Sequence, residues 1–332
     1  MNRKYVDLHL HIDGSLNIAW MYERAKKRKV IPEDMPFTAY YKTIIPDGED
    51  IEAVFKRFDV PLAIMQCEED IHDACYELLK EICRDNVIYA ELRFAPQLHT
   101  REGLSQEDAL RAAIRGINDA MDDYPIKANI LVALMHQGDG AAVNEKENME
   151  SLLLAEKYLG KGVCGLDLAG FENNCDLNEY APLFMLAREK SIPFTIHAGE
   201  MGNAENVHKA LMMGADRIGH GINAVSDEKI LAELVKTQIP LEICATSNLY
   251  FGYTYASHPI HELLRRGCKI VICTDDMSFV LNNMAYEFNM LNKVGISDDM
   301  LDQFTMNAIA EAFISDEEKE KLRKQLKVNT AD

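Results

Sequence analysis

Eight short apolar runs, spread along the whole chain, are the feature that most restricts its fold. They are rich in β-branched residues, and turn or capping residues bound each of them. In the later part of the chain they recur about every 20–30 residues, which is room for one strand and one returning helix. Near-continuous apolar strands are typical of parallel sheets covered on both faces. The pattern therefore predicts an α/β fold, a (β/α)8 TIM barrel, with strands at residues 5–11, 87–94, 128–135, 163–168, 193–197, 216–220, 240–244 and 269–274.

The interval between the first two runs departs from this spacing. Residues 16–84 contain several helical patterns instead of one, which predicts a helical insertion that forms a lid near the barrel mouth. No internal repeat, low-complexity tract or Gly/Ser-rich linker divides the chain. Since α/β barrels of roughly 250 residues or more routinely form one domain, we expect residues 1–332 to be a single domain.

The charge balance restricts the partners of this chain. It has 54 acidic and 35 basic residues and a formal net charge of −19, which repels phosphate backbones and anionic lipid, so we expect neither nucleic acid nor membrane as a partner. No apolar stretch is long enough to span a bilayer, and no apolar signal-peptide core precedes the first strand. Eight scattered cysteines are interpreted as reduced thiols, and together these features favour a cytoplasmic protein.

Chemically capable residues collect at the carboxyl ends of the predicted strands. In barrel enzymes this end of the barrel carries the active site, so the distribution supports both the fold and an enzymatic function. The residues are His9, His11, Asp13, Arg93, His136, Asp167, Gly170, His197, Glu200, His220, Ser247, Asn248, Asp275 and Asp276.

The first strand ends in two histidines that favour a metal site. His9 and His11 are two residues apart, and side chains on a strand alternate between its faces, so both imidazoles point into the barrel. Such a pair alone could also be two polar residues on an exposed strand. With His197 and Asp275 on the same rim, however, the set offers three imidazoles and a carboxylate. These ligands with an open position for water suit one zinc ion, with iron, cobalt or nickel as alternatives, and predict a metal-dependent hydrolase.

Two further residues are candidates for proton transfer. Glu200 follows His197 by three residues, and the intervening Gly199 permits a tight turn that returns the carboxylate towards the metal. We interpret Glu200 as the general acid or base, against the alternative of a carboxylate placed at a helix N-terminus. His220 lies between two glycines at the end of its strand and is interpreted as a base or as support for the metal site, whereas a single His elsewhere is more often structural.

The motifs, taken in order, resemble those of the adenosine deaminases of the amidohydrolase superfamily. The resemblance spans nearly the whole chain. Its motifs are DLHLHIDG at 7–14, YAELRFAPQ at 89–97, GLDLAG at 165–170, IHAGE at 196–200, RIGHG at 217–221, EICATSN at 242–248 and TDD at 274–276.

This resemblance implies a role for each matching residue. His9, His11, His197 and Asp275 would bind zinc, Glu200 would protonate the purine N1, and His220 would orient or activate the attacking water. Among the substrate contacts, His11 would line the site, Asp13 would meet the ribose, the Gly170 N–H would meet purine N3, and Asp276 would meet N7. The implied reaction converts adenosine, and 2'-deoxyadenosine, to an inosine product and ammonia.

Two details refine the choice within the superfamily. Members with two metals commonly use a carboxylated lysine at the end of the fourth strand, and residues 163–170 contain no lysine, which favours one metal. Relatives that act on free adenine tend to have Glu where this chain has Asp13, which favours a nucleoside substrate. Deamination of adenine or of a modified adenosine remains the nearest alternative, and an inactive barrel that binds a purine or a metal is a remote one.

The chain also departs from the family pattern beside the expected substrate contacts. Phe171 stands where many members have Asp, and Met277 stands where Pro is common. These departures leave the exact purine open, and the sequence also leaves open the oligomeric state, the native metal and any motion of the 16–84 insertion.

Overall fold

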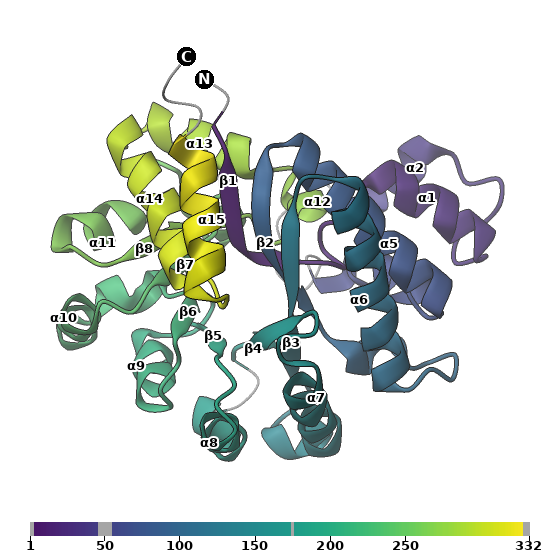
Figure 1. Ribbon diagram of the computed structural model, residues 1–332, viewed down its shortest axis with the longest axis horizontal. Helices are drawn as coiled ribbons and strands as arrows, with labels where there is room; N and C mark the ends of the chain where they lie inside the picture. Colours follow the sequence, from purple (N-terminus) through teal and green to yellow (C-terminus); the bar gives the residue numbers. More distant parts are fainter. Residues whose placement is uncertain (1–2, 46–54, 174–175, 328–332) are drawn as a thin grey trace.

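The strands of this chain form a closed parallel barrel. The computed structural model describes residues 3–45, 55–173 and 176–327. All eight expected strands are present, and Figure 1 shows them at the centre with the helices around them. They are β1 (Tyr5–His11), β2 (Val87–Phe94), β3 (Lys127–His136), β4 (Val163–Gly170), β5 (Thr195–Ala198), β6 (Arg217–His220), β7 (Leu241–Ile243) and β8 (Ile270–Ile272).

Two parallel sheets, each of four consecutive strands, close into this barrel through two junctions. At the first, the Leu166 N–H donates to the Pro193 carbonyl (3.0 Å), which joins β4 to the segment entering β5. At the second, the Asp275 N–H donates to the His9 carbonyl (2.8 Å), and the His11 N–H donates back to the Asp275 carbonyl (3.1 Å). The predicted (β/α)8 barrel is therefore confirmed.

Helices connect the strands and cover the outside of the barrel. The α-helices after β2 are α6 (Gln106–Asp123), α7 (Glu145–Tyr158), α8 (Ala181–Glu189), α9 (Ala204–Met212), α10 (Glu228–Thr237), α11 (Ile260–Arg266), α12 (Met277–Val280), α13 (Met284–Lys293), α14 (Asp298–Glu311) and α15 (Asp316–Lys327). Short 3₁₀ helices are η1 (Pro96–His99), η2 (Ala141–Asn144), η3 (Leu177–Tyr180), η4 (Ile222–Ser226) and η5 (Ser247–Phe251). Within the described residues, no helix combines the length and the apolar character that crossing a membrane requires.

The segment between β1 and β2 contains four described helices. They are α1 (Ile18–Lys27), α2 (Phe37–Ile44), α4 (Asp59–Ile64) and α5 (Glu68–Arg84); residues 46–54 of the expected insertion lie outside the described residues. Arg57, just before α4, donates to the Phe279 carbonyl (2.8 Å) and to the Tyr250 hydroxyl (2.9 Å). These contacts attach α4 to the loops that follow β7 and β8. That the insertion forms a lid near the barrel mouth stays a prediction.

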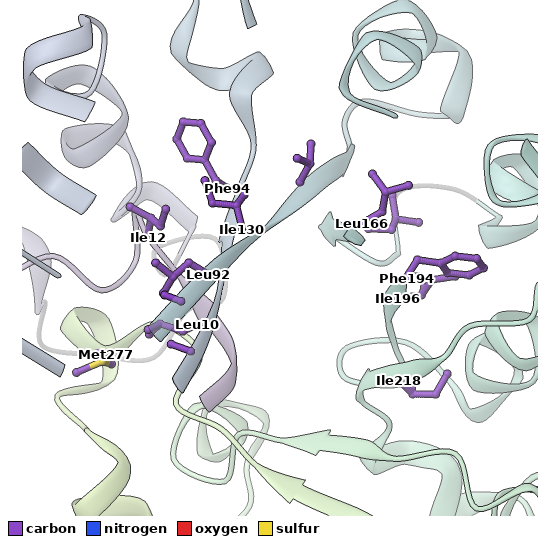
Figure 2. Packing of buried hydrophobic residues seen from close by; sticks show 14 of the residues in the cluster. Leu10, Ile12, Leu92, Phe94, Ile130, Leu166, Phe194, Ile196, Ile218 and Met277 are labelled. Carbon is purple, nitrogen blue, oxygen red and sulfur yellow. The ribbon is translucent and has the colours of Figure 1, made fainter. Parts of the chain in front are cut away.

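The apolar core lies between the strands and the surrounding helices. Figure 2 shows part of it, including Leu10, Leu92 and Ile218 from three different strands. Each of these apolar residues has a buried polar neighbour along its strand: His9 beside Leu10, Arg93 beside Leu92 and Arg217 beside Ile218. Because side chains alternate along a strand, the outward faces supply the apolar core and the inward faces supply the polar residues. The inside of this barrel therefore contains buried charged side chains, among them Arg93 and Arg217.

Candidate active site

Four of the predicted site residues converge at the carboxyl ends of β1, β5 and β8. One nitrogen or oxygen atom from each of His9, His11, His197 and Asp275 lies within 4.8 Å of the other three. His11 Nε2 is 3.3 Å from His197 Nε2, and both His9 Nε2 and His11 Nε2 are 3.4 Å from Asp275 Oδ1. His9 Nε2 is buried without a hydrogen-bond partner among the described residues. A divalent metal ion fits this donor set and would satisfy that nitrogen.

The hydrogen bonds at the far side of two rings prepare their Nε2 atoms for metal binding. His9 Nδ1 is 2.9 Å from Glu242 Oε2, and His197 Nδ1 is 3.0 Å from the Leu168 carbonyl and 3.1 Å from Asp167 Oδ1. All three partner atoms accept hydrogen bonds, so each Nδ1 carries the proton of the neutral ring. Each Nε2 consequently presents a lone pair, as a metal ligand must.

A buried chain of alternating charges holds those two carboxylates. Arg93 donates through Nε to Asp167 (2.9 Å) and through Nη2 to Glu242 Oε2 (2.5 Å). Arg217 donates through Nε to Glu242 Oε1 (2.6 Å) and through Nη2 to Glu91 (2.5 Å). Burial opposes ionisation of Glu242, but the two guanidinium groups outweigh it and hold its pKa well below the ordinary value. Because β2 and β7 are not neighbours, this chain crosses the barrel interior.

A second group of possible ligands shares His9 and Asp275 with the first and adds His220 and Cys244. Burial raises the pKa of the Cys244 thiol well above its ordinary value, which disfavours the thiolate that a metal requires. The set with three histidines is the better metal site.

Glu200 and His220 lie together beside the metal set. Asn248 Nδ2 is 3.1 Å from Glu200 Oε1 and 3.2 Å from His220 Nδ1. Glu200 Oε1 is itself 3.3 Å from His220 Nδ1. Because the Asn248 amide donates, His220 Nδ1 accepts and Nε2 bears the proton of the neutral ring. Burial lowers the pKa of His220 well below its ordinary value and so favours this neutral form.

The Glu200 carboxyl favours the protonated form. Burial raises its pKa well above the ordinary value, and the nearby charges of Asp275 and Glu172 add to this effect. A buried carboxylic acid that keeps its proton near neutral pH can act as a general acid.

The backbone is strained at two of these positions. His220 has φ of +62° and Asp275 has φ of +68°, in the left-handed region that residues with a side chain rarely occupy. Such conformations cost free energy and concentrate at functional sites, where the surrounding structure holds them.

A cavity of about 410 Å³ opens over these residues. The predicted contacts His11, Asp13, Gly170 and Asp276 all line it, together with Glu200 and His220. Burial raises the pKa of Asp13 to about 6.

Two glycines make room for residues of the pocket. A Cβ at Gly14 would lie 1.7 Å from Asp276 Oδ1, and one at Gly170, where φ is +109°, would lie 2.7 Å from the His136 carbonyl. Asp276 Oδ1 is buried and has no hydrogen-bond partner among the described residues. Burial, followed by the charge of Asp275, raises the pKa of Asp276 well above its ordinary value, so this group favours its protonated form.

The two departures from the family pattern have different surroundings. Phe171 lines the pocket and makes an edge contact with Phe55, with their ring centroids 5.4 Å apart. Met277 instead packs in the core beside the strands (Figure 2). His136, at the carboxyl end of β3, also lines the pocket. The sequence assigned no role to Glu242 or Glu172. Glu242 could have been noticed because it is a charged residue inside an otherwise apolar strand.

Comparisons with known proteins agree with these observations. The family model described as adenosine deaminase matches residues 5–329. An adenosine deaminase from Haemophilus ducreyi is 38% identical over 327 residues, which covers 96% of this chain and 94% of that protein. One from Clostridium botulinum (strain Okra) is 35% identical over 338 residues and covers 98% of each chain.

Solved structures share the fold. An adenine deaminase from Arthrobacter aurescens has a TM-score of 0.87 at 22% identity and covers 99% of this chain and 100% of that one. An N6-mAMP deaminase from Arabidopsis has a TM-score of 0.87 at 23% identity and covers 98% of each chain. Given the family match over almost all of its length, the chain belongs to the adenosine deaminase family.

Proposed function

We propose that this chain catalyses the hydrolytic deamination of adenosine, and of 2'-deoxyadenosine, with one zinc ion as its cofactor. The proposal rests on one arrangement, in which four convergent metal-ligand side chains share a pocket with a buried Glu200. Burial raises the pKa of Glu200 well above its ordinary value. The names of the curated relatives support the reaction. An amidohydrolase from Burkholderia ambifaria with bound Zn, which has a TM-score of 0.86 and covers 99% of this chain and 90% of that one at 22% identity, supports the choice of metal.

In this proposal His9, His11, His197 and Asp275 hold the metal. A bound zinc ion supplies hydroxide near neutral pH because it lowers the pKa of a water molecule. Glu242 and Asp167 accept from the Nδ1 atoms of His9 and His197, which directs each Nε2 towards the metal.

Glu200 is the proton donor of the reaction. Its proton passes to purine N1 as the oxygen of water forms a bond to C6, which makes C6 more electrophilic. Of the two protons of that water, one passes to the exocyclic nitrogen and the other restores the Glu200 carboxyl. The bond between C6 and that nitrogen then breaks and ammonia leaves. Asn248, which contacts Glu200 Oε1, keeps the carboxyl in place while the proton moves.

His220 orients the attacking oxygen in this scheme. Its Nδ1 accepts from Asn248, so its Nε2 donates to that oxygen and fixes its direction of attack. This assignment favours orientation over proton abstraction as the role of His220.

Three groups would hold the nucleoside. Asp276 Oδ1 has no hydrogen-bond partner among the described residues, and the raised pKa of Asp276 favours the protonated carboxyl, which donates to purine N7. The Gly170 N–H donates to purine N3. Asp13 accepts from the ribose hydroxyls. Phe171 lies on the apolar wall beside Phe55.

Steady-state kinetics on adenosine, 2'-deoxyadenosine, adenine and N6-methyladenosine test the proposal, with metal content measured on the same preparation. We expect the two nucleosides to be the best substrates and one metal per chain. Adenine as the best substrate would remove the ribose role of Asp13, and wild-type protein without bound metal would refute the metal site.

Glu200→Gln tests the proton donor. It should lower kcat by about 10²–10⁴-fold and leave the metal bound. Glu205→Gln, an exposed position on the following helix, is the matched control and should keep wild-type activity. Near-normal turnover by Glu200→Gln would exclude Glu200 as the donor.

We also propose that the enzyme works in the cytoplasm as a single domain, with the 16–84 insertion as its lid. The seven cysteines among the described residues are all free thiols, which supports a reducing compartment; Cys175 lies outside the described residues.

A further inference from the structure

The loop that carries Glu200 is organised by a carboxylate from a neighbouring loop. Glu172 follows β4 and is almost fully buried. Its Oε2 accepts from the N–H groups of Glu200 (3.1 Å), Met201 (3.1 Å) and Gly202 (3.0 Å), and its Oε1 accepts from the Gly199 N–H (2.5 Å). Four consecutive backbone donors thus surround one carboxylate. Successive N–H groups that face one point form a binding site for an anion, and hydrogen bonds to a charged acceptor are the strong ones.

The site for Glu172 is specific in shape. Asn206, on α9, adds a fifth hydrogen bond to Oε1 (2.9 Å). A Cβ at Gly202 would lie 2.7 Å from Glu172 Oε1, so the loop reaches the carboxylate only because this position is glycine. The Gly199 backbone has φ of +70°, and a Cβ there would lie 2.5 Å from Val207 Cγ2. Both glycines of the loop therefore serve its contact with Glu172 and with α9.

The carbonyl groups of the same loop are held from the opposite side. Asn223, in η4 after β6, donates through Nδ2 to the carbonyls of Glu200 and Gly202, both at 2.8 Å. The loop is consequently fixed through its N–H groups by Glu172 and through its carbonyl groups by Asn223. Glu200 belongs to this loop, and its carboxyl reaches Asn248 from there.

We propose that Glu172 is a positioning residue for the deamination reaction, which fixes the backbone of residues 199–202 and so aims the Glu200 carboxyl at the substrate. The inference rests on the proposed function of Glu200 as the proton donor. Without the carboxylate, four backbone N–H groups lose their shared acceptor, and the contacts of Asn223 alone would have to hold the loop. None of the described metal-ligand residues donates to Glu172, so we expect its variants to retain the metal.

Kinetics of three variants of the full-length, metal-loaded enzyme test this inference. Glu172→Gln places an amide N–H₂ among backbone donors and should lower kcat about 10²-fold, with KM within about 3-fold and the metal content unchanged. Glu172→Asp keeps the charge, and its kcat should be at least about 5-fold higher than that of Glu172→Gln. Gly202→Ala leaves the carboxylate chemistry intact but displaces it, and should reproduce the loss of kcat.

Asn206→Ala is the matched control. It removes one contact to the same buried carboxylate and leaves all four backbone donors in place, so kcat should stay within about 3-fold of wild type. Glu172→Gln with wild-type kcat, or with a loss no larger than that of Asn206→Ala, would overturn the positioning role. Equal kcat values for the Gln and Asp variants would overturn it as well. A wild-type enzyme that does not deaminate any nucleoside would instead refute the proposed function, so the two failures are distinguishable.

Discussion

Arg93→Lys is the change that best tests how the barrel interior prepares the metal site. The Arg93 guanidinium contacts Asp167, Glu242 and the Leu8 carbonyl, the last through Nη1 at 2.8 Å. Those two carboxylates hold His197 and His9. Lysine keeps the positive charge but has a single nitrogen, which cannot span two carboxylates on different strands as the planar fork does.

The contacts of Arg93 set the expected magnitude. Hydrogen bonds to charged groups contribute about 1.5–3 kcal/mol each, and a lysine that keeps one carboxylate loses at least one such bond and leaves the Leu8 carbonyl without its donor. We expect a loss of roughly 3–5 kcal/mol from the free energy of unfolding of the metal-free protein. Freeing the carboxylates that orient the ligand histidines should also weaken metal binding by about 10–100-fold.

Arg217→Lys is a closely matched control. Arg217 is equally buried and also contacts two carboxylates and one carbonyl, that of Glu311 at 2.8 Å, but it meets Glu242 through the oxygen that does not contact His9. Urea unfolding of the metal-free variants should give similar losses of stability. Competition with a chromophoric chelator should show the large loss of metal affinity in the Arg93 variant alone. Equal metal affinities for the two variants would refute the reasoning.

Three further predictions follow from separate features. Removal of the metal by a chelator should abolish activity, and zinc added back should restore it. At 100 times its Kd, zinc should also raise the free energy of unfolding by about 2.7 kcal/mol. Activity that survives complete removal of the metal would contradict the metal role. Gly14→Ala should displace Asp276, because the new Cβ would lie 1.7 Å from Asp276 Oδ1. The variant should lower kcat/KM by about 5–150-fold, which corresponds to roughly 1–3 kcal/mol of transition-state stabilisation. Unchanged kinetics would exclude a substrate contact by Asp276. Burial raises the pKa of Glu287 from 4.5 to about 7, so the stabilising contribution of this group is present below pH 4.5 and is lost as the pH rises through about 7. Glu287→Gln should therefore reduce the fall in unfolding free energy between about pH 5 and pH 8 by on the order of 3 kcal/mol, as urea titrations at the two pH values would show.

The strands could be predicted from the sequence because each is a local apolar run, but their ends could not be placed as well. A run at 193–197 is apolar from its first residue, yet β5 begins at Thr195, because Pro193 and Phe194 lie in the junction with β4. Likewise β8 ends at Ile272, three residues before Asp275, where the backbone enters the left-handed region. These strand ends depend on how distant strands pair when the barrel closes, so the local sequence does not predict them.

The site was predictable where a residue type and its place at a strand end were sufficient. The four metal-ligand candidates come together as the sequence suggested, although metal binding by them stays a prediction. The charges behind them were not predictable, since Arg93 and Glu242 are 149 residues apart and nothing local pairs them. Glu172 was missed for the same reason: its partners belong to another loop.

The junction between β1 and β8 has a consequence for the order in which this protein is made. His9 and His11 leave the ribosome long before Asp275, 266 positions after His9, with which their strand pairs on one side. At about 5–20 residues per second, that edge waits roughly 13–53 s for its neighbour. During this time β1 is an open strand edge, available to other chains. A nascent chain interrupted before residue 275 has neither a closed barrel nor the carboxylate of the metal set, so incomplete products cannot assemble this centre.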